Sequence, residues 1–406
     1  MTMLKKIGAV IKDAWLILGI TVLLFCFLEG SLSLVFHLKD RLGGSESSKA
    51  PSRVLADTYQ DPSWGKAYYK EFSRSKKVRW EPYVYWRRES YRGSYIRIDA
   101  DGIRLTTVAK PKAQSSRPPL KVFMFGGSTL WGTGARDAFT IPSFVARELE
   151  NKGIAAEIKN FGESGYVNTQ EIIALVLQLA KGQIPDLVIF YDGVNDTYSA
   201  YQQRMAGLPE NEFNRVKEFN LSKRSNYKKR AGTVLTDFAS RLATVRLLNG
   251  LFPGLTARSE GEVSNPLGLD NPAPDDGSLA REVVERYVGN IELVRALSEH
   301  YRFRYLVYWQ PTIFQKAHIT EYESSQRKTA QSMERFFQLT TDAIRQSRLT
   351  EKSEYPFSDL SLIFSDVQVP VYLDWMHIGE YGNEIVAKRI AADVLAVTQK
   401  AGVPRN

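Results

Sequence analysis

The stretch that decides the fold is KVFMFGGSTLWG at residues 121–132. It begins with an apolar run at 121–125, and two glycines end that run directly before Ser128. A short apolar run bounded by turn residues is typical of a strand buried inside a sheet. Gly126 and Gly127 allow the backbone to turn sharply, because glycine lacks a Cβ. The stretch therefore predicts a central strand that presents a serine at its carboxyl end.

Four further apolar runs share this character, and longer helical patterns separate them. The runs are AEIKNF at 156–161, LVIFY at 187–191, YLVYW at 305–309 and PVYL at 370–373. The helical patterns fall near 139–152, 168–182, 281–300, 325–347 and 380–398. Strands that alternate with helices indicate a parallel sheet covered on both faces. We therefore expect an α/β fold, a three-layer doubly wound parallel sheet of about five strands, with ligands bound at the carboxyl ends of the strands.

Composition divides the rest of the chain. Residues 42 to about 75 are rich in Gly, Ser, Lys and Pro, which predicts a mobile tether. The alternating residues of 78–104 predict a small β-hairpin unit that packs on the main domain in preference to lining a cleft. We expect an anchor at 1–41, a tether and β-rich flanking segment at 42–118 and a catalytic domain at 119–400. An insertion at about 197–280 interrupts that domain, and a helix is possible around 231–251.

The N-terminal segment has the length of a membrane span. No charge lies between Ala14 and Leu28, and apolar residues resume after Glu29. Lysines precede the run, which favours a cytoplasmic N-terminus and an external domain in a single-pass protein. A cleaved signal peptide is the competing interpretation. Glu29 is unusual within a span, and a position near the outer interface would explain it.

Composition also excludes several classes of function. The 406 residues carry a net charge of +9, with 43% hydrophobic and 24% charged residues, as expected for a folded protein. The basic run KRSNYKKR at 223–230 is better explained as a solvated loop than as a nucleic-acid site. The single cysteine, Cys26, lies in the apolar segment, so we expect no disulfide and no cysteine-bound metal. Oligomeric state is not determined by the sequence.

Histidine is the usual base that activates a serine, and the chain has four. His37, His300 and His318 lie at the end of the apolar segment, at the end of a helix and in a loop. His377 lies between a predicted strand and a helix, with Asp374 three residues before it. On a tight turn a carboxylate at this spacing can fix the imidazole tautomer. An N-capping Asp beside a surface His is the structural alternative.

Two further loops follow the second and third predicted strands. They are NFGESGYVNTQE at 160–171 and YDGVNDTY at 191–198. Gly165 offers a backbone N–H, and Asn195 offers a side-chain amide, at the edge where Ser128 is expected. Singly, both are common turn residues. Phosphate binding by the glycine-rich loop at 126–128 is the lesser alternative, because the loop lacks the lysine of a P-loop.

Four loops with Ser, Gly, Asn and Asp-x-x-His in this order resemble the sequence blocks of the SGNH, or GDSL-like, hydrolases. The blocks are FGGSTLWG, NFGESGYVNT, YDGVND and DWMH, and the resemblance spans about residues 119–398. It implies a flavodoxin-like hydrolase fold with Ser128 as nucleophile and with Asp374 and His377 completing a triad. It also implies oxyanion donors at the Ser128 N–H, the Gly165 N–H and the Asn195 amide. No metal or organic cofactor is implied.

One residue departs from the family pattern. Gly127 stands before the serine where many relatives have Asp, as in GGST-type members that are often associated with surface polysaccharides. Together with the apolar N-terminal segment, the resemblance implies a membrane-anchored serine esterase that removes, or transfers, O-acyl groups on an extracytoplasmic glycan. Hydrolysis of a lipid acyl ester is a second enzyme hypothesis, and a non-catalytic glycan-binding or assembly protein is a third.

Overall fold

The structure is a computed structural model, and it describes residues 2–42, 58–59, 62–107, 118–222, 242–245, 247, 274–351 and 356–400. The chain divides into two units, one formed by 50–212 with 270–406 and the other by 1–49 with 213–269.

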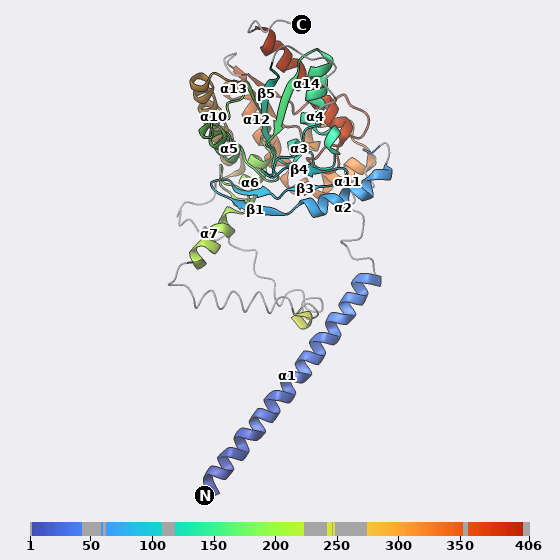
Figure 1. The fold of residues 1–406 in the computed structure, drawn as a ribbon, viewed down its shortest axis with the longest axis vertical. Coiled ribbons are helices and arrows are strands. Elements are labelled where there is room, and N and C mark those ends of the chain that lie inside the picture. Colours follow the sequence, from blue (N-terminus) through green and yellow to red (C-terminus); the bar gives the residue numbers. More distant parts are fainter. Residues whose placement is uncertain are drawn as a thin grey trace. The chain divides into compact units, whose positions relative to one another are not determined.

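A five-stranded parallel sheet forms the centre of the larger unit (Figure 1). Its strands are β5 Leu120–Gly126, β6 Ala156–Asn160, β7 Leu187–Asp192, β8 Arg304–Trp309 and β9 Phe357–Asp359. They are arranged in the order β6-β5-β7-β8-β9, and every neighbouring pair is parallel. The strand order reverses between β5 and β7, which is where sheets of this type bind ligands.

Side chains of each strand alternate between two cores. Val122 and Met124 enter one core, whereas Phe123 and Phe125 enter the other. Helices α4 Ile141–Asn151 and α14 Glu380–Lys400 cover the first face, and α5 Asn168–Ala180 and α10 Asp276–Tyr301 cover the second. The predicted three-layer, doubly wound α/β fold is confirmed.

The larger unit contains further helical elements. They are η2 Pro62–Trp64, α2 Gly65–Ser75, α3 Ser128–Trp131, η3 Asp137–Phe139, α6 Val194–Gln203, η5 Ile313–Gln315, α11 Glu321–Thr329, α12 Gln331–Arg345 and α13 Arg348–Glu351.

The predicted strand PVYL at 370–373 is wrong. The fifth strand is β9, and Tyr372 forms only an isolated antiparallel bridge with Ile378. The N–H groups of Val371 and Tyr372 donate to the buried carboxylate of Glu323, over 2.9 and 3.1 Å. Because a side chain takes these donors, they are not available to a neighbouring strand. The predicted helix at 325–347 is likewise two helices, α11 and α12, which meet at Ala330.

The segment before the sheet is folded more extensively than its composition indicates. The hairpin predicted at 78–104 forms two antiparallel pairs, β1 Val78–Glu81 with β2 Tyr85–Arg88, and β3 Tyr91–Arg92 with β4 Arg97–Ile98. The predicted mobile tether is wrong for its last part, since α2 buries Tyr68 and Phe72. Aromatic side chains on one face of this helix supply the apolar surface that packs against the domain, although the segment as a whole is rich in lysine.

The smaller unit contains α1 Thr2–Leu42, a helix whose segment Ile11–Leu38 has a mean hydropathy of 2.1. This length and composition fit a membrane span or a signal sequence. The Glu29 carboxylate accepts hydrogen bonds from the Ala243 N–H and from the N–H and hydroxyl of Thr244. Glu29, the unusual acid in the apolar helix, therefore has hydrogen-bond partners within its own unit.

The predicted insertion at 197–280 is described only in part. Residues 197–203 belong to α6, 276–280 belong to α10, and α7 Glu212–Ser222 lies between them. Most of the possible helix at 231–251 and the whole basic run at 223–230 lie outside the described residues.

Candidate active site

Ser128 stands at the carboxyl end of β5, as the first residue of the short helix α3. Gly127 precedes it in an extended conformation and turns the chain from strand to helix. Asn195 lies in the first turn of α6, shortly after β7 ends, so both residues flank the point where the strand order reverses. The expected edge of the sheet therefore holds the candidate residues.

The structure brings Ser128, His377 and Asp374 together. The Ser128 Oγ lies 2.7 Å from His377 Nε2, and His377 Nδ1 lies 2.8 Å from Asp374 Oδ2. The three residues are only 8%, 5% and 7% exposed. With Nδ1 protonated toward the carboxylate, Nε2 is left to accept the serine proton. This geometry is able to generate a serine nucleophile.

The Asp-x-x-His loop is built by local hydrogen bonds. Asp374 Oδ1 accepts the N–H groups of Met376 and His377, over 2.9 and 2.8 Å. The Leu373 N–H in turn donates to the His377 carbonyl at 2.8 Å, which closes the loop. Because the carboxylate caps its own loop, it faces the imidazole ring of the residue three positions later.

Asn195 lies against the loop that carries Ser128. Its Nδ2 donates to the Tyr166 carbonyl at 2.7 Å, and a Cβ added to Gly127 would lie 2.3 Å from the same Nδ2. Gly165, beside Tyr166, has a φ of +75°, a conformation that favours glycine. The N–H groups of Ser128 and Gly165 make no hydrogen bond within the described part of the chain. The loops of Gly165 and Asn195 thus meet beside the serine.

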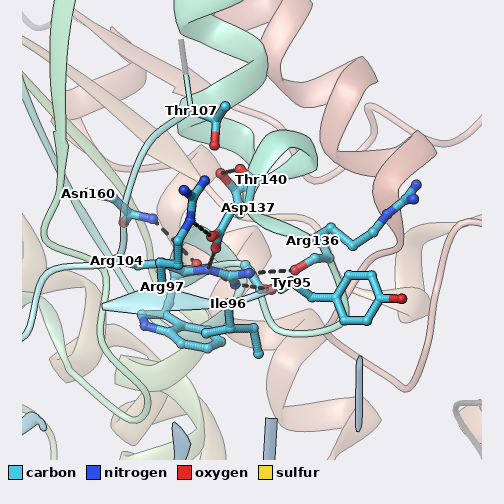
Figure 2. Close-up of polar contacts among 12 residues, drawn as sticks. Tyr95, Ile96, Arg97, Arg104, Thr107, Arg136, Asp137, Thr140 and Asn160 are labelled. Carbon is cyan, nitrogen blue, oxygen red and sulfur yellow. Dashed lines mark hydrogen bonds and ion pairs between the residues drawn. The ribbon is translucent and has the colours of Figure 1, made fainter. Parts of the chain in front are cut away.

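The turn that follows α3 is held by Arg104, a fully buried residue of the flanking segment. Figure 2 shows its guanidinium beside Asp137, to which Nε donates at 3.0 Å. The same guanidinium donates to the carbonyls of Trp131, Gly132 and Ala135. The turn that follows α3 therefore owes its conformation to a cation supplied from outside the sheet.

A cluster of buried carboxyl groups lies behind Asn195, and the sequence analysis missed it. Asp192 accepts hydrogen bonds from Asn168 Nδ2 at 2.7 Å and from the Tyr287 hydroxyl, while Asp196 accepts the Asn168 N–H. Burial raises the pKa of Asp192 to about 6, and burial and the charge of Asp192 raise the pKa of Asp196 to about 8. The signal was available, since Asp192 and Asp196 flank Asn195 in the third sequence block.

Glu171 completes this cluster. Burial, together with the charge of Asp192, raises the pKa of its carboxyl well above the usual range. Neither carboxyl oxygen of Glu171 has a hydrogen-bond partner within the described part of the chain, so nothing offsets the burial of a charge there and the protonated form is favoured. The third block is therefore packed on buried acids whose pKa values are raised.

The other histidines do not join the site. His300 ends α10 and His318 lies in an exposed loop. His37 belongs to the apolar helix α1. Among the described residues, no group of three or more His, Cys, Asp or Glu side chains has an arrangement that holds a metal ion.

No protein-family model matches the chain, and no curated protein matches it. Solved structures similar to it include an acetylxylan esterase from Geobacillus stearothermophilus, at 13% identity and a TM-score of 0.35, covering 68% of this chain and 94% of that one. A second acetyl xylan esterase has 15% identity and a TM-score of 0.32, with coverages of 68% and 100%. A lipase from a goat rumen metagenome has 11% identity and a TM-score of 0.37, with coverages of 68% and 97%. At such low similarity, none of them carries an argument about activity.

Proposed function

We propose that the protein is a serine esterase in which Ser128 is the nucleophile, His377 the general base and Asp374 its orienting carboxylate. The observation that carries this proposal is the pair of short contacts on His377, 2.7 Å to Ser128 Oγ and 2.8 Å to Asp374 Oδ2. A nucleophile, a base and an orienting acid in register are the arrangement that acyl transfer requires. A protein that only binds a ligand does not need them, which disfavours the non-catalytic alternative.

In the first half of the cycle, His377 Nε2 takes the Ser128 proton as Oγ attacks an ester carbonyl. Asp374 stabilises the imidazolium that forms, and His377 then donates the proton to the departing alcohol. In the second half, His377 deprotonates a water molecule that attacks the acyl carbonyl, and it then returns this proton to Ser128 Oγ as the C–Oγ bond breaks and the acid leaves. A sugar hydroxyl in place of water makes the same reaction an acyl transfer.

The Ser128 N–H, the Gly165 N–H and the Asn195 amide are the proposed oxyanion donors. Within the described ranges the two backbone N–H groups donate to no other group, and one Asn195 N–H remains after the other binds the Tyr166 carbonyl. Donors of this kind each contribute a factor of about 10²–10³ to kcat in comparable sites.

We propose an O-acylated, in particular O-acetylated, extracytoplasmic glycan as the substrate, with α1 as a membrane anchor. The apolar segment Ile11–Leu38 and the lysines that precede it support an N-terminus in the cytoplasm. An ester on a glycan of the cell envelope would then lie within reach of the domain.

Fluorophosphonate labelling tests the proposed nucleophile. The full chain in detergent should be labelled, and the Ser128→Ala variant should not be labelled. A panel of acetylated glycans and lipid esters then identifies the preferred substrate. Labelling of Ser128→Ala to the wild-type extent would reject the assignment. Protease added to intact cells tests the proposed topology. An external domain should be digested, and digestion only after lysis would reject this topology.

A further inference from the structure

The loop that carries Gly165 is folded against strand β2 of the flanking segment. The contacts between them are several: the Trp86 indole N–H donates to the Ser164 carbonyl at 3.0 Å, and Arg87 Nη1 donates to the Phe161 carbonyl at 3.2 Å. The Tyr166 hydroxyl donates back to the Trp86 carbonyl. The loop after β6 thus has a partner strand that lies outside the central sheet.

Arg88 makes the most buried of these contacts. Its Nε and its backbone N–H donate to the two Glu163 carboxylate oxygens, over 3.2 and 3.0 Å, and its Nη2 donates to Ser164 Oγ at 2.7 Å. The side chains of Arg88 and Glu163 are 3% and 0% exposed. A planar guanidinium holds a carboxylate and a neighbouring oxygen in one fixed plane, which an ammonium group cannot do.

The same guanidinium touches the nucleophile helix. Its Cζ lies 3.9 Å from the centre of the Trp131 ring, and Trp131 is the last residue of α3, the helix that Ser128 begins. Arg88 therefore contacts the first and second sequence blocks at once. Stacking of a cation on an indole face is favourable and directional.

The contacts continue from this loop to the other proposed donor. The Glu163 N–H donates to the Gly126 carbonyl at 2.9 Å, and the Tyr166 carbonyl accepts the Asn195 amide at 2.7 Å. Gly165 lies between Glu163 and Tyr166. A shift of the loop at Glu163 would consequently move the Gly165 N–H and release Asn195 together.

We propose that Arg88, paired with Glu163, is a positioning residue that sets the geometry of the oxyanion hole from outside the catalytic domain. This inference rests on the proposed esterase function. Arg88 touches no reacting atom: it holds the loop of Gly165 at a fixed place relative to α3. The flanking segment is thereby a required part of the active site, although it supplies none of the triad.

The test distinguishes an effect on the position of the Gly165 loop from an effect on the stability of the fold. Arg88→Lys keeps the charge but loses the planar fork, so we expect kcat on a small chromogenic acetate ester to fall about 10- to 100-fold with KM changed less than about threefold. The double variant Arg88→Met with Glu163→Gln removes both buried charges, so it avoids leaving one of them unpaired. We expect the double variant to melt within a few degrees of wild type and still to show the kcat loss. The pH profile of kcat/KM should be unchanged in both variants, because the triad is intact.

Arg345→Lys is the matched control, since Arg345 pairs with Asp359 and contacts none of these loops. It should have wild-type kcat. A folded double variant with wild-type kcat, or an equal fall in kcat for Arg345→Lys, would overturn the proposal for Arg88. Absence of turnover and of fluorophosphonate labelling in the wild-type chain would instead reject the esterase function, and with it this inference.

Discussion

Gly127 and Asn195 are packed so closely that the first has no room for a side chain. A Cβ on Gly127 would lie 2.3 Å from Asn195 Nδ2, although the backbone of Gly127, with φ −78° and ψ −159°, is one that any residue adopts. The requirement for glycine before the serine is therefore steric and is imposed by Asn195. It gives a physical reason for glycine at position 127, since the larger side chain of an Asp there would displace the amide.

Gly127→Ala should consequently damage catalysis with little effect on folding. Displacing the Asn195 amide would remove one of the proposed oxyanion donors, so we expect kcat to fall by about 10²–10³. Steady-state kinetics on a small acyl ester measure the effect, and a melting curve shows whether the fold is retained.

The double variant Gly127→Ala with Asn195→Ala provides the control. If Gly127 acts only through Asn195, the double variant should be no slower than Asn195→Ala alone. Near-native turnover of Gly127→Ala would show that the amide has no role at this position.

Ser128→Ala and His377→Ala should each reduce kcat by at least about 10³, because a nucleophile and its base act as one unit. The double variant should be little slower than either single variant. Rates for the three proteins, with circular dichroism to compare their folds, decide the point. If the loss of kcat in the double variant equalled the product of the two single losses, Ser128 and His377 would not act as one unit, despite their 2.7 Å contact.

Asn195→Ala should lower kcat by about 10²–10³ with little change in KM, because its amide faces charge that appears mainly in the transition state. Asn195→Asp should be at least as slow, since a carboxylate would face the oxyanion with like charge. Asn and Asp serve turns similarly, so a residue with only a turn role would tolerate this change. Near-native turnover of Asn195→Asp would remove the third block from the mechanism.

The buried acids behind Asn195 predict a pH dependence of stability. The pKa of Asp196 is raised to about 8 by burial and by Asp192, whereas an unfolded Asp titrates near about 4. Between these values the native state keeps a proton that the unfolded state has lost. Asp196 therefore makes stability fall as pH rises through about 4 to 8, with no further change above that range.

Asp196→Asn removes this titration. The melting temperature of the variant should therefore depend less steeply on pH between 5 and 8 than that of the wild type. The slopes should differ by roughly the amount that one bound proton contributes. Thermal unfolding across that range measures the difference. Asp342→Asn on the exposed side of α12 is the control, because the Asp342 side chain is 64% exposed. Parallel wild-type and Asp196→Asn curves would contradict a protonated Asp196.

The sheet was largely predictable because the strand runs are buried on both faces. KVFMF, LVIFY and YLVYW carry an unbroken apolar signal, and each became a strand of the larger unit. The fifth strand was not predictable in this way. Phe357–Asp359 has only three residues, two of them polar, while PVYL has the stronger apolar signal but gives two of its N–H groups to Glu323.

The sequence by itself determined the α/β class, the residues proposed for the triad and the edge of the sheet where they meet, because parallel strands deliver their carboxyl-end loops to one place. Spacing placed Asp374 within reach of His377, since a three-residue turn is a local structure, but the pairing was preferred to an N-capping Asp only together with the Ser, Gly and Asn loops. Only the tertiary structure decided what holds the loops in place. The Arg88–Glu163 pair joins residues 75 positions apart, and Gly127 and Asn195, which crowd each other, follow two different strands. Such contacts depend on how distant segments of the chain pack together. Hydrophobic periodicity and local propensity carry no information about this packing.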